Sequence, residues 1–260
     1  MLKIFSQSYL EQLCSRYRLI PSKKYGQNFL IRQEPIEKMI EAAELTKDDT
    51  VVEVGPGFGV LTFALAEKVK KVVAFEIERK LKPYWDGIIK VFSAGAAREE
   101  GQSVDRENLE IFWGNILYTP YSLLPTSYKV VANLPYQITS NIIRYFLEAK
   151  NKPDAMVLMA QKAVAERICA RPGEMSVLSV AIQYYAQPEI IMNVPRSYFW
   201  PEPKVDSTVI KLKVQSQKSI KSEGTKVFDE EFFKIVKAGF ANRRKLLVKN
   251  LEAIVGKKNR

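Results

Sequence analysis

Three glycines and a later carboxylate have the spacing of a site for a ribonucleoside-like ligand. Gly55, Gly57 and Gly59 directly follow a short β-branched run at 51–54. Glycine lets this turn adopt positive φ and approach a ligand closely, and the helix expected after it would point its free amides at the same place. Glu76 ends the next β-branched run, where such folds place the carboxylate that accepts both ribose hydroxyls.

The spacing of these glycines narrows the choice of cofactor. G-x-G-x-G differs from the G-x-G-x-x-G of nicotinamide enzymes, because Val60 stands in place of the final glycine. Glu53, just before the turn, fits a ligand with a cationic end. The pattern favours S-adenosylmethionine over NAD, and a glycine-rich turn that binds no ligand is the alternative.

A second cluster joins an amide, a rigid kink and an aromatic ring at the end of a predicted strand at 128–132. It consists of Asn133, Leu134, Pro135 and Tyr136. The amide oxygen can accept a hydrogen bond from an exocyclic amine, the carbonyl of Leu134 or Pro135 can accept a second, and the ring can stack on a base. Carboxyl ends of central strands are where open α/β sheets bind ligands. An ordinary turn with a buried tyrosine is the alternative.

For the other candidate residues, a purely structural role is at least as well supported as a role in ligand binding. Asn115 follows a predicted strand at 109–113 and either reaches an adenine amine or caps the strand end. Asn28, in the polar segment at 21–31, either contacts a ligand or belongs to a plain loop, and by itself the segment favours the loop. The rings at 198–200 lie among three prolines, which favours core filling.

Alternating strands and helices predict an α/β protein. Strands are expected at 51–54, 72–75, 109–113, 128–132 and 155–160, with helices at 34–43, 79–90, 139–149, 162–170 and 176–185 and an antiparallel pair at 189–194 and 207–214. We expect residues 1–214 to form a Rossmann-like catalytic domain with helices on both faces of its sheet. Residues 215–260 would form a linker and a small helical appendage, with one basic helix at 232–251. That helix carries Arg243, Arg244 and Lys245, which suit RNA phosphates.

Composition excludes several classes of protein. A net charge of +11 favours a polyanionic partner. The absence of histidine excludes histidine-based triads and, with only Cys14 and Cys169 as cysteines, zinc chemistry and a disulfide framework. With neither a membrane-spanning apolar stretch nor a signal-peptide core, we expect a cytoplasmic protein without a membrane partner.

Taken together, these stretches resemble the KsgA-type family of small-subunit ribosomal RNA adenine N6-dimethyltransferases. The similarity covers K-x-x-G-Q-N-F-L at 23–30, E-V-G-P-G-F-G-x-L-T at 53–62, N-L-P-Y at 133–136, F-x-P-x-P-K-V-D-S at 199–207 and F-x-N-R-R-K-x-L near the end. It implies a monomer that transfers methyl groups from S-adenosylmethionine to two adjacent adenosines near the 3′ end of the rRNA in a pre-ribosomal subunit. It further implies that the target base lies between Tyr136 and Phe199. The cofactor positions it implies are Asn28, Leu30, Gly55, Glu76 and Asn133, and we also expect the neighbouring Gln27 to contact the cofactor.

The chain departs from the family in two places. The family has aspartate where this chain has Asn115, which can still accept from the adenine amine but without a charge. The family also continues through further helices beyond the R-R-K motif, so we expect the appendage here to be incomplete. Two alternatives stay open: a large-subunit adenine dimethyltransferase of the antibiotic-resistance class, and a non-catalytic RNA-binding assembly factor.

Overall fold

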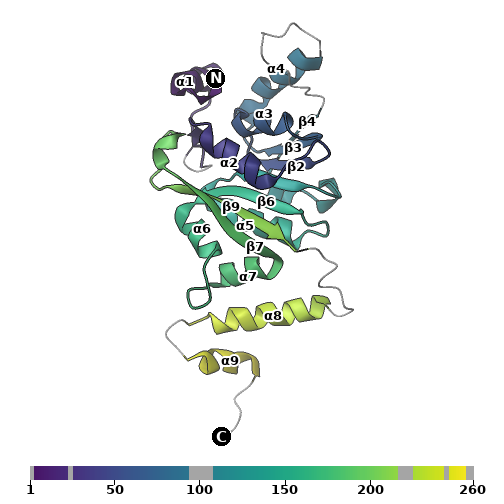
Figure 1. Cartoon of the computed structure of the whole chain (residues 1–260), viewed down its shortest axis with the longest axis vertical. Helices are drawn as coiled ribbons and strands as arrows, with labels where there is room; N and C mark the ends of the chain where they lie inside the picture. The colour runs from purple at the N-terminus through teal and green to yellow at the C-terminus, as the bar shows by residue number, and fades with distance from the viewer. Residues whose placement is uncertain (1–2, 23–25, 94–107, 216–224, 243–245, 256–260) are drawn as a thin grey trace.

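The computed structural model describes residues 3–22, 26–93, 108–215, 225–242 and 246–255 (Figure 1). Its main feature is a seven-stranded sheet in the order β4-β3-β2-β5-β6-β9-β7. The strands are β2 (Thr50–Val54), β3 (Lys71–Glu76), β4 (Leu109–Trp113), β5 (Lys129–Asn133), β6 (Ala155–Gln161), β7 (Ala186–Val194) and β9 (Ser207–Val214). The first five pair in parallel, whereas β9 runs antiparallel to both of its neighbours. The predicted α/β class and antiparallel pair are confirmed.

Helices cover both faces of this sheet, because its central strands are apolar on both sides. On one face, side chains such as Val51, Val72 and Val131 pack with α1 (Gln7–Arg16), α2 (Glu34–Ala43), α3 (Val60–Ala66) and α4 (Lys82–Ser93). On the other, Val52 and Val130 pack with α5 (Thr139–Glu148), α6 (Lys162–Ile168) and α7 (Val177–Tyr185). Alternation along each strand thus assigns its residues to one face or the other.

Short elements complete the described chain. They are the 3₁₀ helices η1 (Lys3–Phe5), η3 (Arg79–Leu81), η4 (Ile116–Tyr118), η5 (Tyr121–Leu123), η6 (Tyr136–Ile138) and η7 (Arg196–Tyr198), and the strands β1 (Phe29–Leu30) and β8 (Phe199–Trp200). β1 and β8 pair antiparallel as a separate two-stranded sheet. The single helix expected at 79–90 is therefore η3 followed by α4. Among the described residues, no helix is long and apolar enough to cross a membrane.

The single basic helix expected at 232–251 is wrong. The structure has two helices there, α8 (Thr225–Gly239) and α9 (Leu247–Val255). The Asn250 amide donates to the carbonyls of Gly239 and Asn242 at 2.9 and 3.0 Å, so α9 folds back on the end of α8. α8 also starts inside the expected linker at 215–226. Arg243, Arg244 and Lys245 lie outside the described residues.

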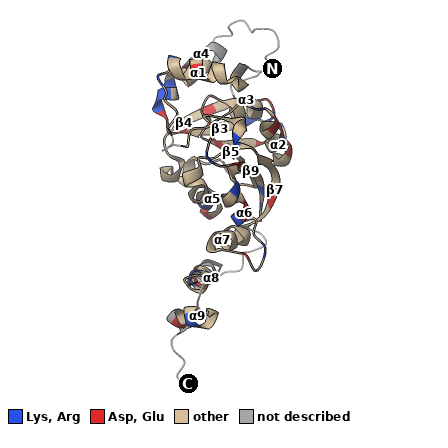
Figure 2. Ribbon diagram, turned by 90° about the vertical axis from the view of Figure 1, so that its left-hand side faces the viewer, with Lys and Arg blue, Asp and Glu red and all other residues tan. Residues whose placement is uncertain are grey.

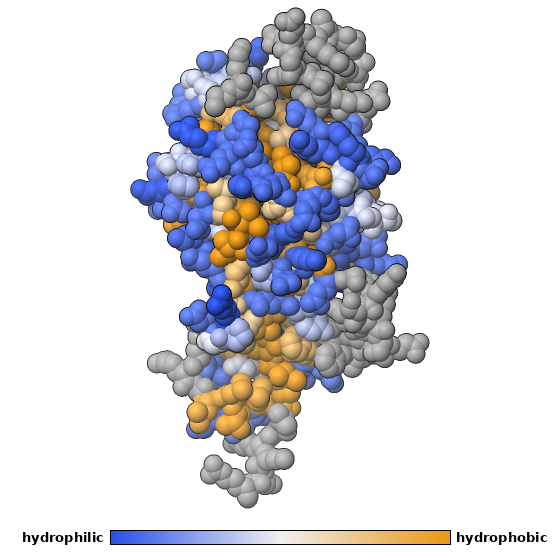
Figure 3. All heavy atoms as spheres, viewed as in Figure 1, coloured by the Kyte–Doolittle hydropathy of each residue, from blue (hydrophilic) through white to orange (hydrophobic). Residues whose placement is uncertain are grey.

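The two C-terminal helices continue from the sheet domain below α7 (Figure 1). The Tyr184 ring of α7 stacks on the Phe232 ring of α8 with centroids 4.7 Å apart. Both helices carry acidic as well as basic residues (Figure 2). Apolar side chains gather at this end of the molecule (Figure 3), where Leu247 and Val248 are exposed. A domain boundary near residue 214 remains a proposal.

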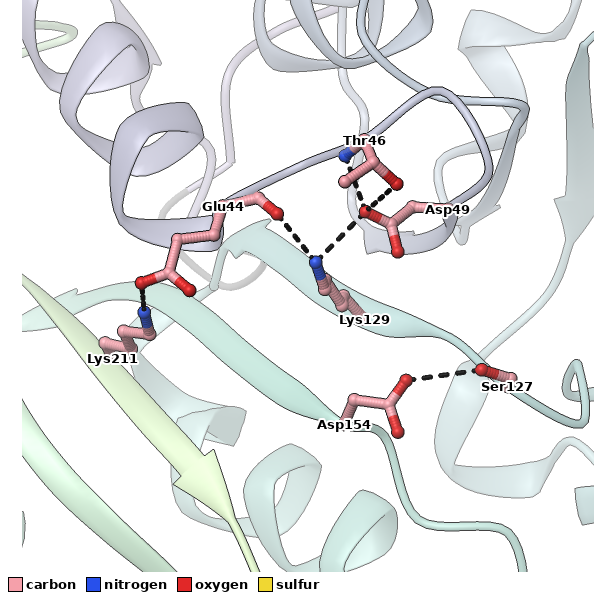
Figure 4. A network of polar contacts seen from close by, with 7 residues as sticks. All are labelled: Glu44, Thr46, Asp49, Ser127, Lys129, Asp154 and Lys211. Carbon is pink, nitrogen blue, oxygen red and sulfur yellow. Dashed lines mark hydrogen bonds and ion pairs between the residues drawn. The ribbon is translucent and has the colours of Figure 1, made fainter.

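A polar network holds together the edge of the sheet where the parallel strands begin (Figure 4). The Lys129 ammonium group donates to the Glu44 carbonyl at 2.8 Å and to the Asp49 carboxylate at 3.0 Å. The same carboxylate accepts from the Thr46 amide, and the Glu44 carboxylate pairs with Lys211 of β9 at 2.6 Å. The network joins the end of α2 to β2, β5 and β9.

We predict that Lys129→Ala lowers the free energy of unfolding by about 1 to 3 kcal/mol, because the Asp49 carboxylate loses its cation and the Glu44 carbonyl loses its donor. The Lys129 and Asp49 side chains are only 17% and 21% exposed. Lys38→Ala is the matched control, since it removes a pair with Glu41 whose side chains are 49% and 70% exposed, and it should cost much less stability because solvent screens that pair. Urea unfolding measures both variants, and equal losses would contradict the prediction.

Candidate active site

A cavity lies at the carboxyl ends of β2, β3 and β5, where strands separated in sequence end side by side. It collects most of the predicted site residues. Its lining includes Gln27, Asn28, Leu30, Glu53, Gly55, Gly57, Glu76, Asn133, Leu134, Pro135, Tyr136 and Phe199. Gly59 and Asn115 are not part of this lining.

The glycine turn forms one wall of the cavity, and its glycines have different roles. Gly55 has φ +74°, and a Cβ there would meet nothing within 4 Å, so the turn leaves open space beside it. Gly59 has φ +86°, and a Cβ there would lie 2.7 Å from the Phe63 ring and 2.8 Å from the Trp85 ring. Gly55 therefore faces the space that a ligand would use, whereas Gly59 allows close packing of α3 and α4.

The Glu76 carboxylate is held against this turn. One oxygen accepts from the Gly57 amide at 3.1 Å and the other from the Glu78 amide at 2.7 Å. The side chain is 5% exposed, and burial raises its pKa, although the backbone donors partly oppose the rise. Trp85 donates from its ring nitrogen to the Gly57 carbonyl at 3.0 Å. The carboxylate is thus oriented at the end of β3, as a ribose-binding acid must be.

Glu53 is the most unusual side chain of the cavity. It is 1% exposed, and its Oε2 atom has no hydrogen-bond partner among the described residues. Burial raises its pKa to about 8; the Thr62 hydroxyl opposes this rise and the nearby Glu76 carboxylate adds to it. Buried polar atoms without partners are rare because they are costly. A cavity lined by this carboxyl group suits a cationic ligand.

The segment from Asn133 to Tyr136 forms the opposite wall. The Leu134 amide donates to the Met159 carbonyl at 3.1 Å, which fixes the end of β5 against β6. The Pro135 carbonyl already accepts from the Ile138 amide and the Thr139 hydroxyl, each at 3.2 Å. Of the two carbonyls considered from the sequence, that of Leu134 is therefore the better candidate to bind a ligand.

The Tyr136 ring is fixed by its hydroxyl. That hydroxyl lies 2.8 Å from the Ser207 hydroxyl at the start of β9, and Ser207 is fully buried. Burial raises the pKa of Tyr136, an effect that the bond to Ser207 opposes. The phenol therefore stays neutral near pH 7, and the ring is held as an uncharged aromatic surface at the cavity.

Phe199 comes to the cavity through the small β1–β8 sheet. In that sheet Leu30 pairs with Phe199 and Phe29 with Trp200. Phe199 is 3% exposed and belongs to the core, yet it also lines the cavity. The core-filling role favoured from the pattern of rings is confirmed, and it is compatible with a role at the site.

Residues 21–260 match the family described as ribosomal RNA adenine dimethylase. The chain belongs to this family. A ribosomal RNA small subunit methyltransferase A of Alkaliphilus metalliredigens is 41% identical over 253 residues, which are 96% of this chain and 84% of the relative. A protein of the same name from Dehalococcoides mccartyi is 40% identical over 249 residues, 95% of this chain and 79% of the relative.

Two solved structures share the fold of this family member. A dimethyladenosine transferase from Plasmodium falciparum has a TM-score of 0.69 at 28% identity, covering 86% of this chain and 74% of the other. The 23S rRNA methyltransferase ErmE also has a TM-score of 0.69, at 26% identity, covering 87% of this chain and 84% of the other. The fold of a chain whose sequence relatives bear the small-subunit name is therefore also the fold of a 23S rRNA methyltransferase.

The remaining predicted residues have mixed outcomes. Asn115 accepts from the Leu117 amide at 3.0 Å and so caps the start of η4, directly after the strand, rather than the strand itself; its contact with a cofactor stays a prediction. The Gln27 side-chain oxygen accepts from the Ser22 amide at 2.8 Å, and the Asn28 amide donates to the Gly26 carbonyl at 3.3 Å. Gln27 and Asn28 lie directly before β1, outside any helix or strand, and both line the cavity.

Sequence reasoning missed several members of this site. Ile77, directly after the predicted carboxylate, lines the cavity and is 48% exposed; its position at the strand end was a usable signal. Phe58, inside the glycine turn, also lines the cavity. Thr62 lies beside Glu53 and affects its pKa, and the Ser207 hydroxyl contacts the Tyr136 hydroxyl. No local sequence pattern identifies either residue.

We predict that Glu53 makes folding stability fall with rising pH. Its folded-state pKa of about 8 lies above the ordinary value of 4.5, so between these values the folded chain holds a proton that the unfolded chain releases. The stability that Glu53 contributes is therefore lost as pH rises through this window. Glu53→Gln should gain about 3 to 4 kcal/mol over wild type between pH 5 and pH 8, since each pH unit inside the window is worth about 1.4 kcal/mol.

Urea unfolding at the two pH values measures this gain. Glu67→Gln serves as the control, because Glu67 is exposed at the end of α3 and should show no such gain. An equal difference between Glu53→Gln and wild type at pH 5 and pH 8 would show that burial does not raise the pKa of Glu53.

Proposed function

We propose that this protein transfers methyl groups from S-adenosylmethionine to N6 of two adjacent adenosines near the 3′ end of small-subunit rRNA, within a pre-ribosomal subunit. One observation carries the proposal: a single cavity joins the acids of β2 and β3 to the amide, carbonyl and ring that follow β5. We further infer that it works as a monomer in the cytoplasm.

The acidic wall fits the cofactor. Glu76 would accept the ribose hydroxyls, Gly55 would let the ligand approach the backbone, and Glu53 would face its cationic end. The carboxyl oxygen of Glu53 without a partner supports this fit. When bound, S-adenosylmethionine supplies an activated methyl group on sulfur. Acid or base catalysis by the protein is therefore not required at the donor.

The wall from Asn133 to Tyr136 would activate adenine N6, which is a weak nucleophile. The lone pair of adenine N6 is delocalised into the ring, and two acceptors that draw the amine towards tetrahedral geometry localise it. The Asn133 side-chain oxygen and the Leu134 carbonyl are these acceptors, so catalysis rests on positioning and electrostatics. Tyr136 and Phe199 would hold a base that has left its stack.

The proposal also specifies which ribosomal subunit carries the substrate rRNA. A net charge of +11 supports a nucleic-acid substrate. Two curated relatives that are 41% and 40% identical to this chain bear the small-subunit name, whereas the likeness to ErmE keeps a large-subunit substrate as the second candidate. The complete wall from Asn133 to Tyr136 argues against a non-catalytic assembly factor.

The proposed activity is tested with labelled S-adenosylmethionine and undermethylated ribosomal subunits. We expect label in the small subunit only, with mass spectrometry locating N6,N6-dimethyladenosine at two adjacent positions near the 3′ end of its rRNA. Asn133→Ala should abolish transfer, and its cofactor affinity must be measured alongside. Label in the large subunit would support the second candidate, and no transfer to either subunit would contradict an enzymatic function.

A substitution series tests the stacking role of Tyr136. Tyr136→Ala should lower the rate of methyl transfer by about 5-fold to 150-fold with unchanged cofactor affinity, because stacking on a base is worth roughly 1 to 3 kcal/mol. Tyr136→Phe and Ser207→Ala both remove the hydroxyl contact and keep the ring, so they should be mild. If Tyr136→Phe is as damaging as Tyr136→Ala, the phenol acts through its hydrogen bond instead.

A further inference from the structure

The described lining of the cavity is acidic, although the chain as a whole is strongly basic. Its ionisable side chains are Glu53 on β2, Glu76 on β3 and Tyr136 after β5, and it contains neither lysine nor arginine among the described residues. α3 adds only the uncharged Thr62 beside Glu53. Among the described lining residues, no cation is therefore available to balance a negative charge on Glu53.

The sheet places Glu53 between the residue proposed to bind the ribose, Glu76, and the residue proposed to bind the target amine, Asn133. This inference rests on the proposed function. β2 lies between β3 and β5, and the pairing of Glu53 with Ala74 and of Val52 with Val130 fixes the registers. Counting two residues along each strand puts Glu53, Glu76 and Asn133 on the same face. A ligand with its ribose at Glu76 and its methyl group near an amine at Asn133 has its sulfur in the region of Glu53.

Glu53 is suited to respond to charge at that sulfur. Its carboxyl group is 1% exposed with one oxygen unpartnered, and its raised pKa of about 8 means that it holds a proton near pH 7 in the absence of a cation. A positive charge placed beside it favours the ionised form. A neutral ligand of the same shape does not.

We propose that Glu53 distinguishes the charged methyl donor from its neutral product by losing its proton to solvent when the sulfonium ligand binds and keeping it when the thioether product binds. During transfer the positive charge moves from sulfur to the methylated amine, which releases a proton, and the carboxylate takes one up. The site then returns to its starting protonation state. Binding of S-adenosylmethionine is thereby favoured over binding of S-adenosylhomocysteine.

Calorimetry tests the proposal at pH 7, in two buffers of different ionisation enthalpy, with S-adenosylmethionine and S-adenosylhomocysteine as the probes. The wild-type protein should release close to one more proton with the first ligand than with the second. Because the amino groups of the ligands also titrate, the proton count is compared between wild type and Glu53→Gln. That variant should lose the extra proton, and its preference for the sulfonium ligand should fall by about tenfold.

Glu76→Gln is the comparison variant, because the ribose is common to both ligands; it should weaken both and change their affinity ratio less than Glu53→Gln does, since Glu76 acts on the protonation of Glu53 only as a neighbouring charge. Equal proton release with the two ligands in wild type, or an unchanged affinity ratio in Glu53→Gln, would overturn the role of Glu53 while leaving the cofactor assignment intact. If neither ligand binds the wild-type protein, the cofactor assignment and the role of Glu53 both fail.

Discussion

The hydrogen bond from the Gly57 amide to the Glu76 carboxylate joins two neighbouring strands at the edge where the site forms. Other contacts depend on the position of this turn. Trp85 donates to the Gly57 carbonyl, Tyr84 donates to the Phe58 carbonyl at 2.8 Å, and both residues belong to α4. The carboxylate that would bind the ribose is thus also the group that fixes the turn.

The same turn positions the segment that covers it. The Phe29 ring lies 5.1 Å from the Phe58 ring between centroids, and the Ile31 amide donates to the Tyr198 carbonyl at 2.8 Å. Phe29 belongs to β1, whose partner β8 carries Phe199. Residues from distant parts of the sequence therefore reach one cavity through a continuous series of contacts that starts at Gly57.

The sequence was sufficient for the features that depend on local pattern. Apolar runs identified the central strands, and residues at their carboxyl ends gave most of the cavity, since parallel strands share that edge. It failed where the outcome depends on contacts between distant residues. The break between α8 and α9 depends on Asn250 reaching back to Gly239, and the choice of the Leu134 over the Pro135 carbonyl depends on how α5 begins. The close packing that requires Gly59 involves Trp85, which no spacing rule could indicate.

The two substrates of the proposed reaction meet surfaces of opposite charge. Basic residues in excess attract the phosphates of RNA to the chain as a whole, whereas the described cavity lining offers buried acids and neither lysine nor arginine. Phosphates are therefore disfavoured inside the cavity, and the part of the RNA suited to enter is an uncharged base. The acids cost folding stability because they are buried, and the polar network around Lys129 stabilises the sheet at its opposite edge. Contacts that stabilise the fold are thus found where the parallel strands begin. The carboxyl ends of the same strands carry acids that are suited to bind a ligand, although they cost stability.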